Sequence, residues 1–387
     1  MNHVAAKKSA FYFVIVVGIV SLFADMTYEG ARSINGPFLA LLGANAFVVG
    51  AVAGSGELIG YALRMVSGRW ADRSRKYWLI TIAGYVCNML AVPLLAFVGQ
   101  WPLAALLMII ERAGKGLRVP PRDAMLSHAC ERLGSGFGFG LHEALDQTGA
   151  VLGPLLAALA FHLSGQYHDS YLFLLFPALC ALLMLGVARH QFPRPEQLSI
   201  KQTALPSRIS SRAFIYYLIA SSLVAAGFAD FPLMAYHFEK MQLLPSAMIP
   251  VTYAGAMGAS GVTGLLLGPL YDRQGLIVLL IVTLIAAFFA PLVFLTHGSW
   301  IVLGVALWSI GVGAQGSLMR AVIANQVPAD KRATAYGTFN LVYGVAWFAG
   351  SLVIGALYNV SFIAVVSFSL VTQLLGVAFL YVVVKCS

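Results

Sequence analysis

Long apolar segments constrain this chain more than any other feature. Twelve of them follow one another along the sequence, most with at least the roughly 20 residues that an α-helix needs to cross a bilayer. Charged residues make up only 10% of the sequence, against about 25% in soluble domains. Because a helix satisfies its own backbone hydrogen bonds in lipid, the sequence predicts an all-α membrane protein. The expected spans are residues 10–42, 46–71, 77–98, 101–120, 134–163, 169–190, 212–238, 246–271, 275–296, 299–326, 332–358 and 361–384.

The expected helices form two halves that resemble each other. The polar segment 191–211 separates an N-terminal six-helix bundle, residues 1–190, from a C-terminal six-helix bundle, residues 212–387. Short landmarks recur in both halves in the same order. Two pseudo-symmetric bundles with a substrate site between them are a layout of alternating-access transporters. The landmark pairs are Phe23-Ala24-Asp25 with Phe228-Ala229-Asp230, Gly68–Arg73 with Gly268–Arg273, and Phe137-Gly138 with Tyr336-Gly337.

Basic residues mark one side of this twelve-helix path. Lys7 and Lys8 precede the first span, and further lysines and arginines follow spans two, six, eight and ten, whereas the connections on the other side contain only Lys240. This distribution predicts a multi-pass protein of the inner membrane with both termini and the central loop in the cytoplasm. The formal charge of +9 then needs no nucleic acid to explain it. The four cysteines lack metal-ligand spacing and are expected to be free thiols.

Charged side chains interrupt the fourth apolar segment. Glu111 and Arg112 lie about halfway across it, where an ionised group costs about 2.5–3.5 kcal/mol. Glu111, Lys115 and Arg118 share one face if the helix continues. Pro120-Pro121 is expected to kink or end the helix near the water boundary. Two interpretations remain open: an ion pair that only joins helices, or the wall of an aqueous transport cavity.

Several motifs resemble the major facilitator superfamily over essentially the whole chain, in particular its drug:proton antiporter branch. Residues Gly68 to Lys76 resemble its signature between the second and third helices, and Arg112 to Gly116 resembles its helix-four motif. The resemblance implies a conformational latch at Gly68, Asp72, Arg73, Arg75, Asp272 and Arg273. It also implies a helix-five bend at Gly149, Gly153 and Pro154, for which the alternative is a small-residue face that packs closely on another helix.

Ionisable groups at membrane depth are the candidate functional residues. The resemblance implies that helices one, four, seven and ten line the cavity. A buried carboxylate takes up a proton more readily, and a nearby arginine opposes this, so a change in their separation can load and release a proton. Permanent pairing is the alternative. The proton-coupling candidates are Asp25, Glu29, Glu111, Arg112, Glu143 and Asp146. The substrate-binding candidates are Asp25, Glu29, Lys115, Asp230, Tyr236, Gln315, Arg320 and Trp347.

These features predict a proton-coupled antiporter that exports a small organic, drug-like or cationic solute. A carrier of an anionic metabolite or metal chelate, including an importer, is the alternative, and a non-transporting membrane sensor is more remote. No motif for ATP binding, metal binding or catalysis is recognised, so no enzyme and no cofactor other than the proton are expected. The expected partners are a small-molecule substrate, protons and the lipid bilayer, without nucleic acid, and the protein is expected to act as a monomer.

Overall fold

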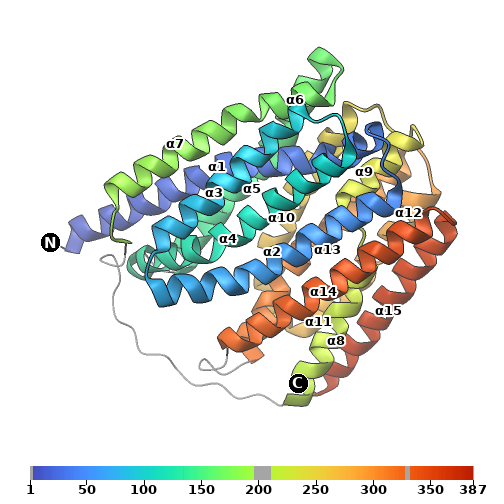
Figure 1. Cartoon of the computed structure of the whole chain (residues 1–387). Helices are drawn as coiled ribbons and strands as arrows, with labels where there is room; N and C mark the ends of the chain where they lie inside the picture. Colours follow the sequence, from blue (N-terminus) through green and yellow to red (C-terminus); the bar gives the residue numbers. More distant parts are fainter. Residues whose placement is uncertain (1–2, 134, 196–210, 327–331, 387) are drawn as a thin grey trace. The chain divides into compact units, whose positions relative to one another are not determined.

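The fold is helical throughout the described residues, 3–133, 135–195, 211–326 and 332–386, of a computed structural model (Figure 1). The helices of the first half are α1 (His3–Leu41), α2 (Ala46–Ser74), α3 (Tyr77–Leu94) with the short η1 (Leu95–Phe97), α4 (Trp101–Leu133), α5 (Ser135–Ser164), α6 (Tyr167–Phe173) and α7 (Leu175–Gln191). Those of the second half are α8 (Ser211–Gly227), α9 (Phe231–Lys240), α10 (Met248–Gln274), α11 (Leu276–Ala286), α12 (Phe289–Leu295), α13 (Ser299–Gln326), α14 (Arg332–Tyr358) and α15 (Phe362–Cys386).

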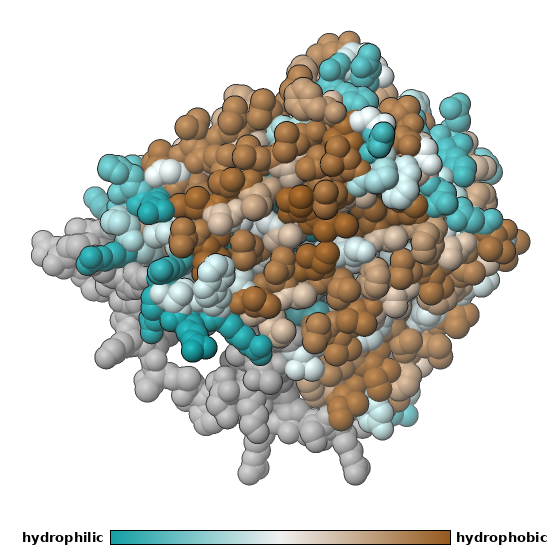
Figure 2. All heavy atoms as spheres, viewed as in Figure 1, coloured by the Kyte–Doolittle hydropathy of each residue, from teal (hydrophilic) through white to brown (hydrophobic). Residues whose placement is uncertain are grey.

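The predicted all-α membrane class is confirmed. Among the described residues, 11 segments are long and apolar enough to cross a membrane. The remaining long helix, α4, has 33 residues and is therefore about 50 Å long at 1.5 Å per residue. It falls outside that set because its middle carries several charged side chains. Large apolar side chains cover the lengths of the helices on the visible face, and hydrophilic ones gather near helix ends (Figure 2).

The predicted end of the fourth helix is wrong, because α4 continues through Pro120 and Pro121 to Leu133. Proline removes the hydrogen bond to the carbonyl four residues earlier, which for Pro120 is the carbonyl of Gly116. The hydroxyl of Ser67 on α2 donates to that carbonyl at 3.2 Å. A neighbouring helix thus satisfies the freed backbone group, which is how proline is tolerated within membrane helices.

Three spans expected as single helices are interrupted. Residues 228–230 separate α8 from α9, Leu174 separates α6 from α7, and residues 287–288 separate α11 from α12. In each case the second helix carries a proline among its first three residues: Pro177, Pro232 and Pro291. Proline suits the first helical turn, where its missing N–H would have no intrahelical partner. The most consequential interruption leaves Asp230 outside the regular helix, as the N-cap of α9.

The chain forms two compact units. One contains residues 1–34 and 59–203, and the other contains residues 35–58 and 204–387. The end of α1 and the first half of α2 therefore pack with the C-terminal helices. Gly50 and Gly54, for example, contact Ser351 and Phe348 of α14. The bundle boundaries expected from the sequence stay a prediction, and they assign 35–58 differently from this packing.

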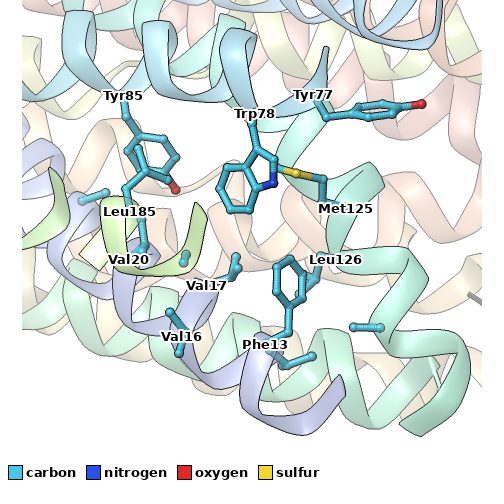
Figure 3. Packing of buried hydrophobic residues seen from close by; sticks show 14 of the residues in the cluster. Phe13, Val16, Val17, Val20, Tyr77, Trp78, Tyr85, Met125, Leu126 and Leu185 are labelled. Atoms are coloured by element: carbon cyan, nitrogen blue, oxygen red, sulfur yellow. The ribbon is translucent and has the colours of Figure 1, made fainter. Parts of the chain in front are cut away.

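A cluster of buried apolar side chains fixes α1, α3, α4 and α7 against one another in the N-terminal unit (Figure 3). The indole N–H of Trp78 on α3 donates to the carbonyl of Phe192 at 3.0 Å, just beyond α7. This packing positions the polar stretch of α1 opposite that of α4. The labelled members are Phe13, Val16, Val17 and Val20 from α1, Tyr77, Trp78 and Tyr85 from α3, Met125 and Leu126 from α4, and Leu185 from α7.

Candidate functional site

Polar side chains of α1 and α4 meet in three successive contacts, which we call the α1–α4 ladder. Glu29 lies 3.7 Å from the ammonium group of Lys115. One turn earlier on α1, Asp25 lies 3.4 Å from Arg118. One turn earlier again, the Ser21 hydroxyl accepts a hydrogen bond of 2.9 Å from Arg122. The spacing of four residues on α1 places Ser21, Asp25 and Glu29 on one face, opposite the basic face of α4.

Glu111 and Arg112 extend the ladder at the Glu29 end. The carboxylate of Glu111 lies 3.6 Å from Arg112. It also accepts a hydrogen bond of 2.6 Å from the side-chain amide of Asn88 on α3. The same amide donates to the backbone carbonyl of Glu111 at 2.9 Å. Glu111 is therefore held from two sides, by Arg112 and by Asn88.

The Tyr28 ring contacts two basic side chains at this end of the ladder. The ammonium nitrogen of Lys115 lies 3.5 Å from the centre of its ring, and the guanidinium carbon of Arg112 lies 4.7 Å from it. The Tyr28 hydroxyl accepts a hydrogen bond from Arg112. Such cation–π contacts contribute about 2 kcal/mol or more when desolvated. The ring thus holds Arg112 and Lys115 beside the α1 carboxylates.

Arg118 occupies the centre of the ladder and is the largest fully buried side chain in the described chain. Its guanidinium carbon lies 4.4 Å from the ring centre of Tyr85 on α3. Among the described residues, its Nε and Nη1 atoms have no hydrogen-bond partner. Asp25 is thus its one ionic partner in that part of the chain, and the pair depends on a single contact.

The ladder is buried but not uniformly sealed. The side chain of Lys115 is 19% exposed and that of Arg112 is 12% exposed, against 0% for Arg118. The carboxylates do not follow the same order, since Asp25 is 11% exposed, Glu29 10% and Glu111 5%. Paired charges agree with both interpretations of the α4 charges, because an ion pair that joins helices and a cavity wall would each show them.

Helix α5 adds a histidine and an aspartate to the ladder. His142 is buried, and its Nε2 lies 2.9 Å from the Ser21 hydroxyl. Asp146 follows one turn later on the same face, within electrostatic range of Arg122. Glu143 is exposed and accepts a hydrogen bond of 3.2 Å from Gln147 on its own helix. Of the two predicted α5 carboxylates, the structure brings Asp146 toward the ladder and leaves Glu143 outside it.

Close helix packing makes these contacts possible. A Cβ atom at Gly149 would lie 2.2 Å from the carbonyl oxygen of Leu22, and one at Gly153 would lie 2.1 Å from that of Met26. Both glycines of α5 are thus in backbone contact with α1, as the small-residue alternative describes. Helix α5 continues past Pro154, and the bend expected there stays a prediction.

The glycines of the helix-four motif, Arg112 to Gly116, also allow close helix packing. A Cβ atom at Gly114 would lie 2.5 Å from the backbone nitrogen of Asn88 on α3. A Cβ atom at Gly116 would lie 2.7 Å from the carbonyl oxygen of Gly60 on α2. The two glycines let α4 approach a helix on each side. The close approach to α3 also brings Asn88 within reach of Glu111.

The C-terminal unit presents one buried carboxylate among aromatic rings. Asp230 accepts a hydrogen bond of 2.7 Å from the indole N–H of Trp347 on α14. The ring centre of Trp347 lies 5.9 Å from that of Phe228. The Trp308 indole donates to the carbonyl of Ala229 at 2.9 Å. Discontinuous helices that present a charged group in this way are typical of transporter substrate sites.

The other predicted site residues are spread more widely. Gln315 accepts a hydrogen bond of 2.5 Å from Tyr343, and Tyr236 accepts one of 3.2 Å from Lys240. At the expected latch, Asp72 accepts a bond of 3.3 Å from the Tyr77 hydroxyl. Its neighbours Gly68, Arg73, Arg75 and Arg273 lie at the ends of α2 and α10, with all three arginines exposed. The side chains of Asp272 and Arg320 fall outside the described part of the chain.

Some side chains of the ladder were not among the candidates. Ser21, Tyr28 and Asn88 are uncharged, so a search for ionised residues at membrane depth passes over them. Ser21 carries the one available signal, because it lies four residues before Asp25 and eight before Glu29. Tyr28 and Asn88 act through contacts with α4 that no local pattern indicates.

A family model described as Major Facilitator Superfamily matches residues 9–351. The chain belongs to this superfamily. An uncharacterized protein of Mycobacterium tuberculosis (strain ATCC 25618 / H37Rv) is 39% identical over 382 residues, which is 97% of this chain and 93% of the relative. An uncharacterized MFS-type transporter of Methanocaldococcus jannaschii is 27% identical over 361 residues, which is 90% of this chain and 89% of the relative.

Solved structures of superfamily transporters share this fold. A mutant of the nucleoside transporter NupG is similar with a TM-score of 0.77 and 13% identity, over 95% of this chain and 99% of that chain. A POT family transporter in complex with 5-aminolevulinic acid is similar with a TM-score of 0.76 and 12% identity, over 96% and 95%. At such identities the similarity concerns the fold alone. The family match and the membrane-length helices together make this protein a multi-pass membrane transporter of the superfamily.

Proposed function

We propose that this protein is a proton-coupled antiporter that exports a small organic cation from the cytoplasm across the inner membrane. The observation that supports the coupling is the α1–α4 ladder. Its buried carboxylates, Asp25, Glu29 and Glu111, each lie beside one cation of α4. Ionised groups are costly at membrane depth and are characteristic of ion pathways and proton relays.

The ladder suits proton exchange because each contact depends on a separation that can change. A carboxylate beside an arginine stays ionised, and the same carboxylate takes up a proton when the arginine moves away. A change of one pK unit corresponds to about 1.4 kcal/mol. Moving one charge through about 100 mV supplies about 2.3 kcal/mol. One or two carboxylates therefore suffice to couple transport to the proton gradient.

Asp230 and its aromatic neighbours support a cationic substrate. A carboxylate beside Trp347 and Phe228 combines an opposite charge with ring faces that attract organic cations. An anionic metabolite is the second candidate, because Lys115 and Arg112 are the ladder residues with the most exposed side chains. The two candidates require opposite charges on the transported molecule, so transport of charged probes separates them.

Neutralising the ladder carboxylates tests the coupling. We expect Asp25→Asn, Glu29→Gln and Glu111→Gln to reduce proton-driven ethidium transport in proteoliposomes by at least about tenfold, since positioned proton-transfer groups contribute about 10²–10⁴-fold. Asp169→Asn, at the start of α6 and away from the ladder, is the control. Retention of wild-type pH-driven transport by all three ladder variants would show that the proposed coupling is wrong.

Changes at Asp230 test the substrate class. We expect Asp230→Asn to weaken the apparent affinity for ethidium and tetraphenylphosphonium about 10–100-fold, because an interaction with a charged group contributes about 1.5–3 kcal/mol. Trp347→Phe keeps a ring but loses the donor to Asp230, so a smaller loss is expected. Trp300→Phe, at an exposed position of α13, is the matched control. Unchanged cation affinity in Asp230→Asn, together with transport of benzoate, would favour the anionic alternative.

A further inference from the structure

We propose that His142 and Asp146 of α5 form a proton relay that connects Asp25 with the N-terminal end of α5. This inference rests on the proposed coupling and adds two carriers to it. The side chain of Asp25 is only 11% exposed, so a proton needs a route to it. His142 stands seven residues from Ser135, where α5 begins, a distance of about 10 Å along the helix.

The packing of α1 and α5 places the relay groups in order. Gly149 meets Leu22 and Gly153 meets Met26, so the two helices run in the same direction. His142 reaches Ser21 at 2.9 Å. Asp25 and Asp146 each lie four residues further along their own helix. Asp146 thus follows His142 by one turn along α5, and it acts electrostatically on Asp25.

His142 lies among charged side chains of two neighbouring helices. His142 is faced by Arg118, Arg122 and Asp123 of α4 and by Asp25 of α1. The nearest cation, Arg122, bonds to the same Ser21 hydroxyl as the imidazole. An imidazole can accept a proton on one ring nitrogen and give one up from the other.

Asp146 is suited to receive that proton. Its Oδ1 atom is buried and has no hydrogen-bond donor among the described residues. Arg118, Arg122 and Lys115 of α4 and Glu143 of α5 act on it electrostatically, as does Asp25 of α1. A buried carboxylate oxygen without a donor is satisfied when the group is protonated or when water reaches it.

Each step transfers one proton from one group to the next, and each proton donor thereby returns to its starting state. A proton from solution binds a ring nitrogen of His142. That N–H bond breaks as an O–H bond forms on Asp146, directly or through one water. The O–H bond of Asp146 then breaks as one forms on Asp25, which leaves His142 neutral and Asp146 ionised. No oxidant, reductant or other reactant is required.

His142→Gln is the decisive variant, because glutamine can still bond to Ser21 but cannot carry a proton. Net proton movement is followed with pyranine inside proteoliposomes, and exchange of labelled for unlabelled ethidium is measured at equal pH on both sides. We expect the net coupled rate to fall at least about tenfold, the low side of what a positioned proton carrier contributes, while exchange stays within about twofold. Asp146→Asn is expected to behave in the same way. His162→Gln, exposed on the same helix, should match the wild type.

Two results would overturn the relay. One is wild-type net proton movement by His142→Gln across the pH range. The other is an equal loss of net movement and exchange, which indicates that His142 only maintains the helix contact. If the wild-type protein exchanges ethidium but moves no protons, the proposed coupling itself fails and the relay with it. If both the wild type and the His142→Gln variant move protons together with ethidium, the relay is wrong and the proposed proton coupling still stands.

Discussion

Arg118→Ala is expected to destabilise the N-terminal unit more than any other single change in the ladder. Removing one partner of a buried ion pair costs about 3–5 kcal/mol, because the remaining charge stays buried. Here the remaining charge is Asp25, 3.4 Å from the lost guanidinium. The stacking on Tyr85 is lost as well. For a unit of this size we expect Tm in detergent micelles to fall by roughly 10 °C.

The double variant Arg118→Ala/Asp25→Asn separates the charge from the packing. Neutralising Asp25 removes the unpaired charge, so we expect the double variant to recover much of the lost stability. Arg69→Ala, at an exposed position near the end of α2, should leave Tm within about 1–2 °C, since surface changes are usually within about 0.5 kcal/mol. Losses at Arg118 and Asp25 that simply add would show that the two side chains do not interact energetically.

Most of the fold follows from the apolar pattern of the sequence. The number and order of membrane-length helices depend on hydropathy and on charge placement, both of which are local. The interruptions of three expected spans do not follow from the apolar pattern. Asp230 lies in an apolar stretch whose average composition fits an unbroken helix. Pro232 is the one local signal that a new helix begins there. The continuation of α4 past Pro120 depends on Ser67, a residue of another helix.

The candidate site could be predicted by residue type but not by pairing. Expensive charges at membrane depth single out Asp25, Glu111 and Arg112 whatever they contact. Glu111 and Arg112, which are adjacent in the sequence, form one of the ion pairs. Asp25 instead pairs with Arg118, which lies on another helix. Such pairings depend on the relative rotation and depth of two helices, which no local pattern of residues determines.

The ladder and the Asp230 site differ in a way that fits separate tasks. Acidic groups of α1 face basic groups of α4 across the ladder, so its net charge is small and its state depends on which partners are in contact. Asp230 is bonded to an uncharged indole and lies beside aromatic rings. A carboxylate in such surroundings suits the proposed binding of an organic cation. This division explains why we expect ladder variants to change coupling and Asp230 variants to change substrate affinity.

Gly149→Ala/Gly153→Ala is expected to have the second largest effect, because it acts on the backbone contact that aligns α1 with α5. The added methyl groups would lie 2.2 Å and 2.1 Å from carbonyl oxygens of α1, so the helices must separate. Overpacking typically costs about 1–3 kcal/mol per site, which exceeds the gain of about 1 kcal/mol from replacing a helical glycine by alanine. Separation would also break the 2.9 Å contact between Ser21 and His142.

Gly140→Ala provides the matched control on the same helix. A Cβ atom at Gly140 has no neighbour within 4 Å, so only the helix-propensity gain applies and Tm should stay equal or rise slightly. We therefore expect Tm, measured by intrinsic fluorescence in detergent, to fall in Gly149→Ala/Gly153→Ala and to stay equal or rise slightly in Gly140→Ala. We also expect proton-coupled transport to fall in the double variant and to persist in Gly140→Ala. A double variant as stable and as coupled as the wild type would show that α5 can move away from α1 at no cost, and the ladder would then not depend on their close approach.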